Sequence, residues 1–326
     1  MREITFIQAV NEAYDEELAR DPSVIVLGED IGQYWGGPQG DFRGLFDKYG
    51  ENRLIETPIS ETAILGGAIG AAVAGMRPVA HIMFADFLGV VGDEILNQLT
   101  NMRYMFGGKA KVPVTIASYS GAGVSTAAQH SKCVEGLFMS VPGLKIATPS
   151  DPYDAKGLLK SAIRDDNPVM FFQRTIMNLS RDKGAVPEEE YLIPLGKANI
   201  KKAGNDVTVL AIGTMVHRAM VAADMVSKEG IDIEVIDLRT VSPLDMEAIL
   251  NSVGKTGRLA IIDEEPLTGS AASIIAGLVA QQGFDLLKKP IKLVCAPDTP
   301  VPFSPVLEKY WMPDENNLME AIKDSV

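Results

Sequence analysis

Residues 53–83, RLIETPISETAILGGAIGAAVAGMRPVAHIM, hold two short apolar runs on either side of a longer segment rich in glycine and alanine. The runs at residues 53–57 and 78–83 have the length of buried strands, and residues 60–75 have the length of a helix. A strand, a helix and a second strand in this order form the unit from which parallel sheets are built. The same alternation extends from a strand expected at residues 24–27 to one at residues 169–172, with a longer helix expected over about residues 87–106, and predicts an α/β fold.

The alternation is interrupted once along the chain. Between about residues 177 and 205 the sequence is polar, contains the run Glu188-Glu189-Glu190 and is punctuated by proline and glycine, which is typical of a linker. A chain of 326 residues also exceeds the size at which a single core usually stops growing. We therefore predict two parallel-sheet domains, residues 1–180 and 206–326, with residues 181–205 as the linker.

The composition argues against several classes of partner. The chain carries 30 basic and 43 acidic residues, a net charge of −13, which argues against nucleic acid or an anionic membrane and leaves room for a basic protein partner. Its longest apolar stretch, residues 63–76, is too short to span a bilayer, and no secretory signal is visible. The two cysteines, Cys133 and Cys295, lie far apart without a CxxC motif. We therefore expect a cytoplasmic protein.

Glu61 lies in the first turn of the helix expected at residues 60–75, directly after Ser60 as a candidate N-cap. Taken alone, such a carboxylate is most simply explained as a complement to the helix dipole. The glycines that follow change this interpretation, because a glycine inside a helix costs about 1 kcal/mol relative to alanine. They indicate that this helix closely approaches another backbone. A carboxylate at the tip of a buried helix is a candidate for acid–base chemistry.

The second candidate is His130, at the end of a glycine-containing loop, residues 121–131, GAGVSTAAQHS. We interpret the other two histidines, His81 and His217, as structural residues. Loops held by a rigid sheet commonly carry functional groups. A carboxylate and an imidazole can divide acid and base duties near neutral pH, so Glu61 and His130 are the predicted catalytic residues.

Other kinds of site are not supported by the sequence. The loop at residues 121–123 lacks the third glycine of a dinucleotide fingerprint, and a Walker motif is absent. The cysteines and histidines show no metal-ligand spacing, which argues against a zinc site. Met83, Phe84 and Phe87 lie where a strand passes into a helix. Their simplest explanation is core packing, although the carboxyl ends of parallel strands are also where ligands bind.

Taken together, these motifs resemble the β subunit of the thiamin diphosphate-dependent dehydrogenase component of 2-oxo acid and acetoin dehydrogenase complexes. The resemblance runs the full length of the chain. It is carried by residues 27–30 (LGED), 57–61 (TPISE), 127–131 (AAQHS), 142–145 (PGLK), 152–158 (PYDAKGL), 162–168 (AIRDDNP), 234–240 (EVIDLRT) and 299–303 (TPVPF). It implies a thiamin diphosphate pyrimidine-binding domain followed by a transketolase C-terminal-like domain.

The resemblance implies a role for each candidate residue. Glu61 would hydrogen-bond a ring nitrogen of the pyrimidine, so that the cofactor's own amino group can remove the proton from its thiazolium carbon. Met83 and Phe87 would pack against the pyrimidine. His130 would face the reacting carbon and assist transfer to a lipoyl group. Glu29 resembles a member of the acidic chain that links paired active sites in this family.

The resemblance also implies further cofactors and partners. Relatives bind potassium through backbone carbonyls, and the matching positions are Val114, Ala162, Asp165 and Asn167. The family's diphosphate and magnesium motif, Gly-Asp-Gly, is absent from this chain. An α subunit would therefore hold the magnesium and the diphosphate, in a heterotetramer of two α and two β subunits. The subunit-binding and lipoyl domains of a dihydrolipoyl acyltransferase core would be the other partners.

The substrate is less well indicated than the family. Residues 103–110 and 296–304 resemble acetoin dehydrogenase β subunits, whereas residues 33–44, with Tyr34, suit pyruvate enzymes. We predict cleavage of the carbon–carbon bond beside a carbonyl of acetoin, placed ahead of pyruvate, with transfer of the acyl group to a lipoyl domain. The alternatives are a branched-chain 2-oxo acid dehydrogenase β subunit and a non-catalytic assembly subunit. A nicotinamide-dependent oxidoreductase is disfavoured by the missing phosphate fingerprint.

Overall fold

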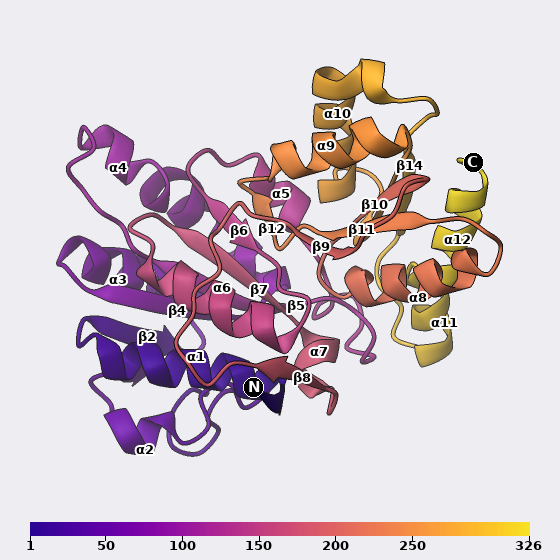
Figure 1. Ribbon diagram of the computed structural model, residues 1–326. Coiled ribbons are helices and arrows are strands. Elements are labelled where there is room, and N and C mark those ends of the chain that lie inside the picture. The colour runs from indigo at the N-terminus through magenta and orange to yellow at the C-terminus, as the bar shows by residue number, and fades with distance from the viewer. The chain divides into compact units, whose positions relative to one another are not determined.

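The computed structural model describes residues 1–326, and the chain divides into two compact units. Unit 1 comprises Met1–Ser120 and Val141–Leu195, and unit 2 comprises Gly121–Ser140 and Gly196–Val326. Each unit is built around a sheet with parallel strands and helices on both faces (Figure 1). The α/β fold expected from the alternation is therefore confirmed.

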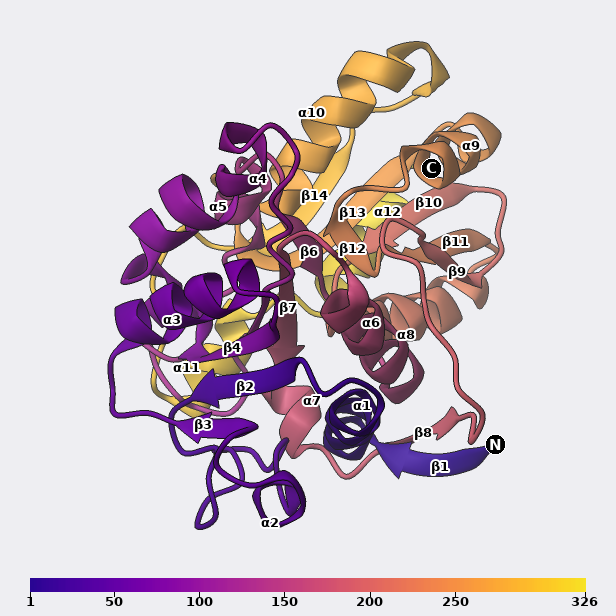
Figure 2. The ribbon, with the colours of Figure 1, turned by 90° about the vertical axis from the view of Figure 1, so that its left-hand side faces the viewer.

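Unit 1 contains parallel strands in the order β6-β7-β5-β4-β2-β3. They are β2 (Val24–Gly28), β3 (Leu54–Glu56), β4 (Arg77–Phe84), β5 (Thr115–Ser120), β6 (Lys145–Ala147) and β7 (Val169–Arg174). The covering helices are α1 (Phe6–Arg20), α2 (Leu45–Tyr49), α3 (Glu61–Val73) and α6 (Pro152–Arg164), followed by α7 (Thr175–Leu179). Figure 2 shows α1 and α6 side by side on one face of the sheet and α3 on the other. Every residue of β2, β5 and β7 is buried, as expected for a sheet covered on both faces.

The long helix expected from about Phe87 to Phe106 is not formed. The chain instead makes a 3₁₀ turn, η1 (Ala85–Gly89), a π-helical segment, η2 (Glu94–Leu99), and the short helix α4 (Met102–Met105). The side chain of Thr100 donates to the carbonyl of Ile95 (2.9 Å), and that of Asn101 donates to the carbonyl of Leu96 (2.9 Å). These side-chain bonds compete with the regular α-helical pattern and end it.

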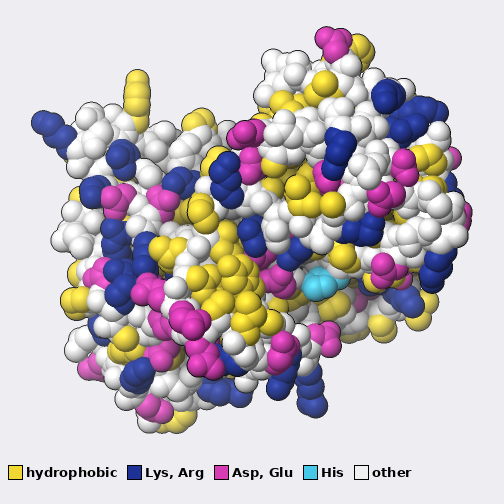
Figure 3. All heavy atoms as spheres, viewed as in Figure 1, with side chains coloured by type: hydrophobic (Ala, Val, Ile, Leu, Met, Phe, Trp, Pro, Cys, Tyr) yellow, Lys and Arg dark blue, Asp and Glu magenta, His cyan; other side chains and the backbone are white.

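Residues 181–205, expected to be a linker, contribute a strand to each unit. The strand β8 (Lys183–Val186) pairs antiparallel with β1 (Arg2–Thr5) in unit 1. The ring of Tyr191 then stacks on Tyr153 of α6 with centroids 4.5 Å apart. In Figure 3, hydrophobic side chains gather over α6, bordered by charged ones. Residues 181–195 are therefore part of the surface of unit 1, where β8 pairs with β1, and this surface position accounts for their polar composition.

Unit 2 contains a five-stranded sheet in the order β14-β13-β10-β11-β9, in which only β9 runs antiparallel. Its strands are β9 (Asn199–Lys202), β10 (Val207–Ala211), β11 (Ile233–Asp237), β13 (Leu259–Pro266) and β14 (Lys292–Ala296). The short β12 (Thr240–Ser242) follows β11 in the sequence and does not pair in this sheet. The helices are α5 (Glu135–Met139), α8 (Met215–Ser227), α9 (Met246–Thr256), α10 (Ala271–Gly283), η3 (Phe284–Leu286), α11 (Pro305–Trp311) and α12 (Glu315–Lys323). Helices α8 and α12 cover one face, and α9 and α10 the other (Figure 1).

No helix of the chain combines the length and the apolar character needed to cross a bilayer.

Candidate active site

The carboxyl ends of three adjacent strands in unit 1 meet at one edge of the sheet. Strand β2 lies between β4 and β3, and all three run parallel. Glu29 directly follows β2, Glu61 begins α3 shortly after β3, and Met83 and Phe87 lie at the end of β4 and just beyond it. Open parallel sheets bind ligands at this edge. The structure therefore brings four of the predicted site residues to one place.

Glu61 is half-buried and is the first residue of α3. Ser60 occupies the N-cap position, but its side chain makes no capping hydrogen bond, and its hydroxyl donates to the carbonyl of Pro58 (3.1 Å). The predicted side-chain cap is therefore wrong. The N-terminal backbone N–H groups of α3 keep their capacity to favour a negative charge beside them.

Glu29 is half-buried as well, and it is electrostatically coupled to Glu61. Burial raises the pKa of the Glu29 carboxyl, the negative charges of Glu61 and Asp30 raise it further, and His81 acts in the opposite direction. Carboxyls whose pKa is shifted by burial and by a specific charged neighbour are enriched at functional sites.

A half-buried apolar surface lies beside these carboxylates at the end of β4. It includes Met83, Phe84 and Phe87. The rings of Phe84 and Phe87 meet edge to face, with centroids 6.1 Å apart and planes at 87°. A second edge-to-face contact joins Phe84 to Tyr119 (5.8 Å). Aromatic side chains fixed in this way offer a firm apolar wall for a planar ring.

Below this edge lies a buried polar cluster that the sequence analysis missed. The hydroxyl of Tyr119 donates to one carboxylate oxygen of Asp41 (2.7 Å), and Nε2 of His81 lies 3.5 Å from the other. Burial, together with the charge of Asp41, holds the pKa of Tyr119 well above its usual value. His81 is only 1% exposed, which agrees with its interpretation as a structural residue. Asp41 lies in a glycine-rich stretch that reads as an exposed loop, and no sequence signal marks it as buried.

The loop that carries His130 belongs to unit 2, although the predicted first domain, residues 1–180, includes it. Its backbone is unusual, since Ser125 and Ala127 both have a φ of +59°. A non-glycine residue in this region costs about 1–3 kcal/mol and persists only where its surroundings enforce it. Within the loop, the hydroxyl of Thr126 donates to the carbonyl of His130 (3.0 Å) and lies 2.7 Å from that of Ser131.

Three buried carboxylates of unit 2 bind the backbone of this segment. Ala122 N donates to Glu264 (2.5 Å) at the end of β13, Gly123 N donates to Glu308 (2.8 Å) of α11, and Gly136 N donates to Glu265 (3.0 Å). These bonds explain why Gly121–Ser140 groups with unit 2. The acidic run that follows the apolar part of β13 is a signal in the sequence that would have suggested these contacts.

Glu265 has the most strongly perturbed carboxyl of this group. Burial raises its pKa to about 9, aided by the charges of Asp263 and Glu135 and opposed by hydrogen bonds from the backbone N–H groups of Ala271 and Gly136. Glu265 therefore keeps its proton at neutral pH. It can hold the start of α5 without placing another negative charge in the core.

Comparison with known proteins identifies the family. A family model described as the transketolase pyrimidine binding domain matches residues 2–177, and one described as the transketolase C-terminal domain matches residues 196–318. The acetoin:2,6-dichlorophenolindophenol oxidoreductase subunit beta of Cupriavidus necator is 50% identical, over 100% of this chain and 98% of that protein. The chain belongs to the β subunits of thiamin diphosphate-dependent dehydrogenases. The resemblance drawn from the sequence motifs is thereby confirmed.

Other β subunits of this family are also similar over nearly the full length. The pyruvate dehydrogenase E1 component subunit beta of Bacillus subtilis is 44% identical, over 99% of this chain and 98% of that protein. The 2-oxoisovalerate dehydrogenase subunit beta of the same organism is 42% identical, over 99% of both. A solved structure described as a split gene transketolase, inactive beta4 tetramer, has a TM-score of 0.81 at 24% identity and covers 99% of this chain and 98% of that one. It confirms the fold.

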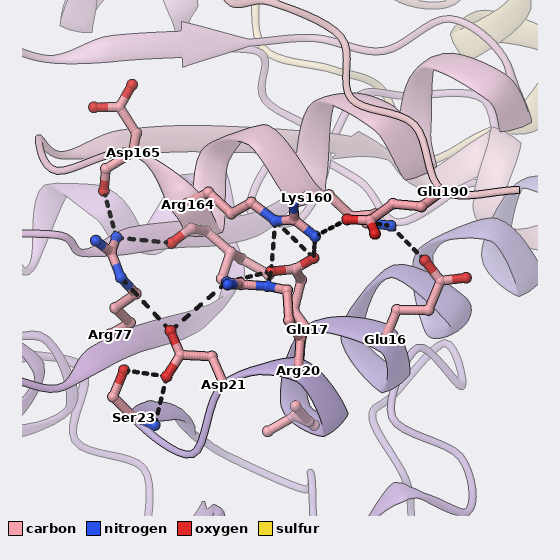
Figure 4. Close-up of polar contacts among 12 residues, drawn as sticks. Glu16, Glu17, Arg20, Asp21, Ser23, Arg77, Lys160, Arg164, Asp165 and Glu190 are labelled. Carbon is pink, nitrogen blue, oxygen red and sulfur yellow. Dashed lines mark hydrogen bonds and ion pairs between the residues drawn. The ribbon is translucent and has the colours of Figure 1, made fainter.

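The four positions predicted to hold potassium lie just before β5 (Val114), on α6 (Ala162), and between α6 and β7 (Asp165 and Asn167). The backbone carbonyls of Val114 and Ala162 each accept one backbone N–H, at 3.0 and 3.2 Å. The carbonyl of Asp165 accepts from the guanidinium of Arg77 (3.1 Å), as Figure 4 shows, while Asn167 lies just before β7. A carbonyl oxygen has two lone pairs, so each can still contact one cation.

A cavity of about 720 Å³ flanks the His130 loop within unit 2. Residues Gln129 and Lys132, on either side of His130, line it from the loop, and Pro300, Val301 and Trp311 line it from the C-terminal part of the chain. The lining is largely apolar. The chain segment that carries His130 therefore borders a space that an apolar ligand group can enter.

Proposed function

We propose that this chain cleaves the carbon–carbon bond beside a carbonyl group, with acetoin placed ahead of pyruvate as substrate, and passes the acyl group to a lipoyl domain. The observation that carries the proposal is the full-length 50% identity to an acetoin:2,6-dichlorophenolindophenol oxidoreductase subunit beta, compared with 44% and 42% to the pyruvate and 2-oxoisovalerate enzymes. The half-buried Glu61 at the carboxyl edge of the sheet supports it.

The residues at this edge fit the pyrimidine end of thiamin diphosphate. When bound, that cofactor supplies a carbon nucleophile for the substrate carbonyl. Glu61 would hydrogen-bond the ring nitrogen, and beside it lies Glu29, whose pKa is raised by burial and by the charges of Glu61 and Asp30. Met83 and Phe87 would orient the ring by packing against it. His130 would face the reacting carbon and stabilise negative charge on the substrate oxygen.

The exchange of Glu61 for glutamine tests this proposal. With the chain co-expressed with its α subunit, we expect Glu61→Gln to lower turnover about 10²–10⁴-fold, because general acid–base assistance is lost. The assay follows thiamin-dependent reduction of an artificial acceptor with acetoin, pyruvate and branched-chain 2-oxo acids, and the highest kcat/KM identifies the substrate.

The matched control is Glu51→Gln, the same exchange at an exposed site of unit 1, which should leave turnover unchanged. Retained activity in the Glu61→Gln enzyme would rule out the role of this carboxylate. Activity that is lost equally in both variants would show a general effect on assembly.

The partner we propose is an α subunit that supplies magnesium and the diphosphate site, in a heterotetramer of two α and two β subunits. Helix α3 supports it, since a helix that is apolar all round is normally buried. Here Gly66 and Gly70 are exposed, with nothing within 4 Å of the place a Cβ would occupy, and Ile59 is 81% exposed. The close backbone approach expected from the glycines is therefore not made inside this chain and is left to another one.

The remaining elements of the proposal are a potassium ion, an acyltransferase core and a cytoplasmic location. The carbonyls of Val114, Ala162, Asp165 and Asn167 would hold the potassium, and the same assay run in sodium salts tests it, because unchanged activity and stability would exclude it. The net charge of −13 suits the basic subunit-binding domain of a dihydrolipoyl acyltransferase. The absence of a disulfide agrees with a reducing compartment.

A further inference from the structure

The His130 loop is hydrogen-bonded to a carboxylate that lies more than 180 residues further along the sequence. Glu308, in the first turn of α11, is only 3% exposed. Its Oε1 accepts from the backbone N–H of Gly123 (2.8 Å) and of Ser125 (3.2 Å). Its Oε2 accepts from the N–H of Ser125 (2.9 Å) and from its hydroxyl (3.2 Å). All four hydrogen bonds of this buried carboxylate therefore come from the loop.

These bonds act at the point where the loop backbone is strained. Gly123 and Ser125 have φ angles of +104° and +59°, and Ala127 also has +59°. A serine or alanine adopts this conformation only where its surroundings enforce it. Donors that converge on one carboxylate are such an enforcing contact, because hydrogen bonds to an ionised acceptor are the stronger kind.

A short chain of contacts leads from Glu308 to His130. Ser125, bound by the carboxylate, is followed by Thr126, whose hydroxyl donates to the carbonyl of His130 (3.0 Å). The same hydroxyl lies 2.7 Å from that of Ser131, which is 1% exposed. Thr126, in the middle of the loop, is thus joined to the C-terminal end of the loop. A shift of the backbone at Ser125 moves the residue that fixes the carbonyl of His130.

We propose that Glu308 is a positioning residue for His130, and that it acts through Ser125 and Thr126 without touching the substrate. This inference rests on the proposed function, because it gives His130 a catalytic role. An amide cannot replace the carboxylate, since one of its two ends would turn N–H donors toward the N–H groups of the loop. The loop would then relax, and the imidazole would leave its productive place.

The test is Glu308→Gln in the assembled enzyme. We expect kcat to fall about 10- to 100-fold, as is typical when a catalytic group is displaced by a remote change. The KM should stay within about threefold, because substrate binding is not touched. Hydrogen exchange of the peptide covering residues 121–131 should become faster. The matched control is Glu320→Gln on the neighbouring helix α12, where the side chain is exposed. This exchange should change neither kcat, nor KM, nor the exchange rate of the loop.

A second variant separates positioning from mere structural support. Adding Ser125→Gly to Glu308→Gln should recover at least about a third of the difference in kcat between the parent enzyme and the Glu308→Gln enzyme. Glycine adopts the positive φ without needing contacts that hold it there. Should Glu308→Gln not assemble, Glu308→Asp replaces it, since it keeps the charge but is too short to reach all donors. A smaller fall of kcat is then expected.

Three outcomes would overturn the inference. They are an unchanged kcat in Glu308→Gln or Glu308→Asp, an unchanged exchange rate of the loop, and a double variant as slow as the single one. The proposed function is judged independently by Glu61→Gln and His130→Ala. If those two variants are inactive while Glu308→Gln turns over normally, only the positioning role fails. If they are active, the proposed function itself fails.

Discussion

Asp41 shows how much a single buried side chain can contribute in this molecule. It is fully buried in unit 1 and accepts the hydroxyl of Tyr119 at 2.7 Å, while Nε2 of His81 lies 3.5 Å from its second oxygen. Both partners are themselves buried and come from the adjacent strands β4 and β5. The carboxylate therefore ties the loop before α2 to the centre of the sheet. His81 itself pairs with the last residue of β2, the strand that Glu29 directly follows.

We expect Asp41→Ala to lower the free energy of unfolding by about 2–4 kcal/mol, because it leaves the buried hydroxyl of Tyr119 without its acceptor and removes the carboxylate that lies beside the buried His81. Urea denaturation followed by circular dichroism measures it. Asp47→Ala, at an exposed position of the same unit, should stay within about 0.5 kcal/mol of the parent chain. A loss below 1 kcal/mol at Asp41 would show that water replaces its contacts.

At the residue scale, the sequence predicted those site residues that stand in a local pattern. Glu61 begins a helix of small residues, and Glu29 and Met83 follow or end apolar strands, so their common edge follows from the parallel order alone. Asp41 and Glu308 carry no local mark. Their partners are 78 and about 180 positions away in the chain, and only the folded backbone brings each pair together.

At the scale of elements, helices α1 and α6 are joined by a ladder of ion pairs (Figure 4). Lys156, Lys160 and Arg164 follow one another at intervals of four residues, which places them on one face of α6. The ammonium groups of Lys156 and Lys160 lie 2.6 and 2.5 Å from the two oxygens of Glu16, and both lysines are almost fully buried. Arg164 pairs with Glu17 at 2.6 Å. The basic residues on this face of α6 thus pair with acidic residues of α1, and these pairs fix how the two helices are aligned along each other.

We expect Glu16→Gln to cost about 1–2 kcal/mol at pH 7, a discounted value because the Glu16 side chain is 37% exposed and water can replace part of the pair. Burial alone would raise the pKa of Glu16, but hydrogen bonds and charges from Lys156 and Lys160 outweigh it and lower the pKa below 4.5. A carboxyl whose pKa is lower in the folded than in the unfolded chain stabilises the fold at pH values above its unfolded pKa. This contribution is lost as the pH falls through the folded pKa.

The measurement is urea unfolding of the parent chain and of the Glu16→Gln chain, at pH 7 and at successively lower pH. The difference between them should shrink once the pH falls below about 4.5 and continue toward zero through the lowered pKa of Glu16. A difference that stays constant with pH would mean that the pair adds nothing beyond packing.

The elements themselves were predictable to different degrees. Strands such as β2 and β7 are continuous apolar runs flanked by turns, and their positions agree with expectation to within a few residues. The segment at residues 85–106 was not predictable in this way, because Thr100 and Asn101 divert the hydrogen bonds of the preceding turn. The polar residues 181–195 pack on unit 1 through partners on α1 and α6 that no local pattern reveals.

At the scale of the whole molecule, the surface that most needs an explanation is the exposed side of α3. This helix is built almost entirely of Gly, Ala, Ile, Leu and Val, yet one side of it is exposed. Exposed apolar surfaces of this kind mark protein interfaces. The chain also lacks the Gly-Asp-Gly motif, and the proposed α subunit would both cover this surface and supply the diphosphate half of the cofactor site.

We expect Gly66→Glu to separate folding from assembly. Because Gly66 is exposed and nothing lies within 4 Å of a Cβ built there, the isolated chain should fold as before, and it should gain up to about 1 kcal/mol, since glycine is a poor helix former. Association with the α subunit should weaken at least about tenfold, because the change buries an unpaired charge in an apolar interface. Gly254→Glu, at an exposed position of the amphipathic α9, should give the same gain without affecting association. Urea unfolding of the isolated chains measures the gain in stability, and analytical ultracentrifugation of the co-expressed subunits measures association. Normal assembly of the Gly66→Glu chain would show that the α subunit binds elsewhere.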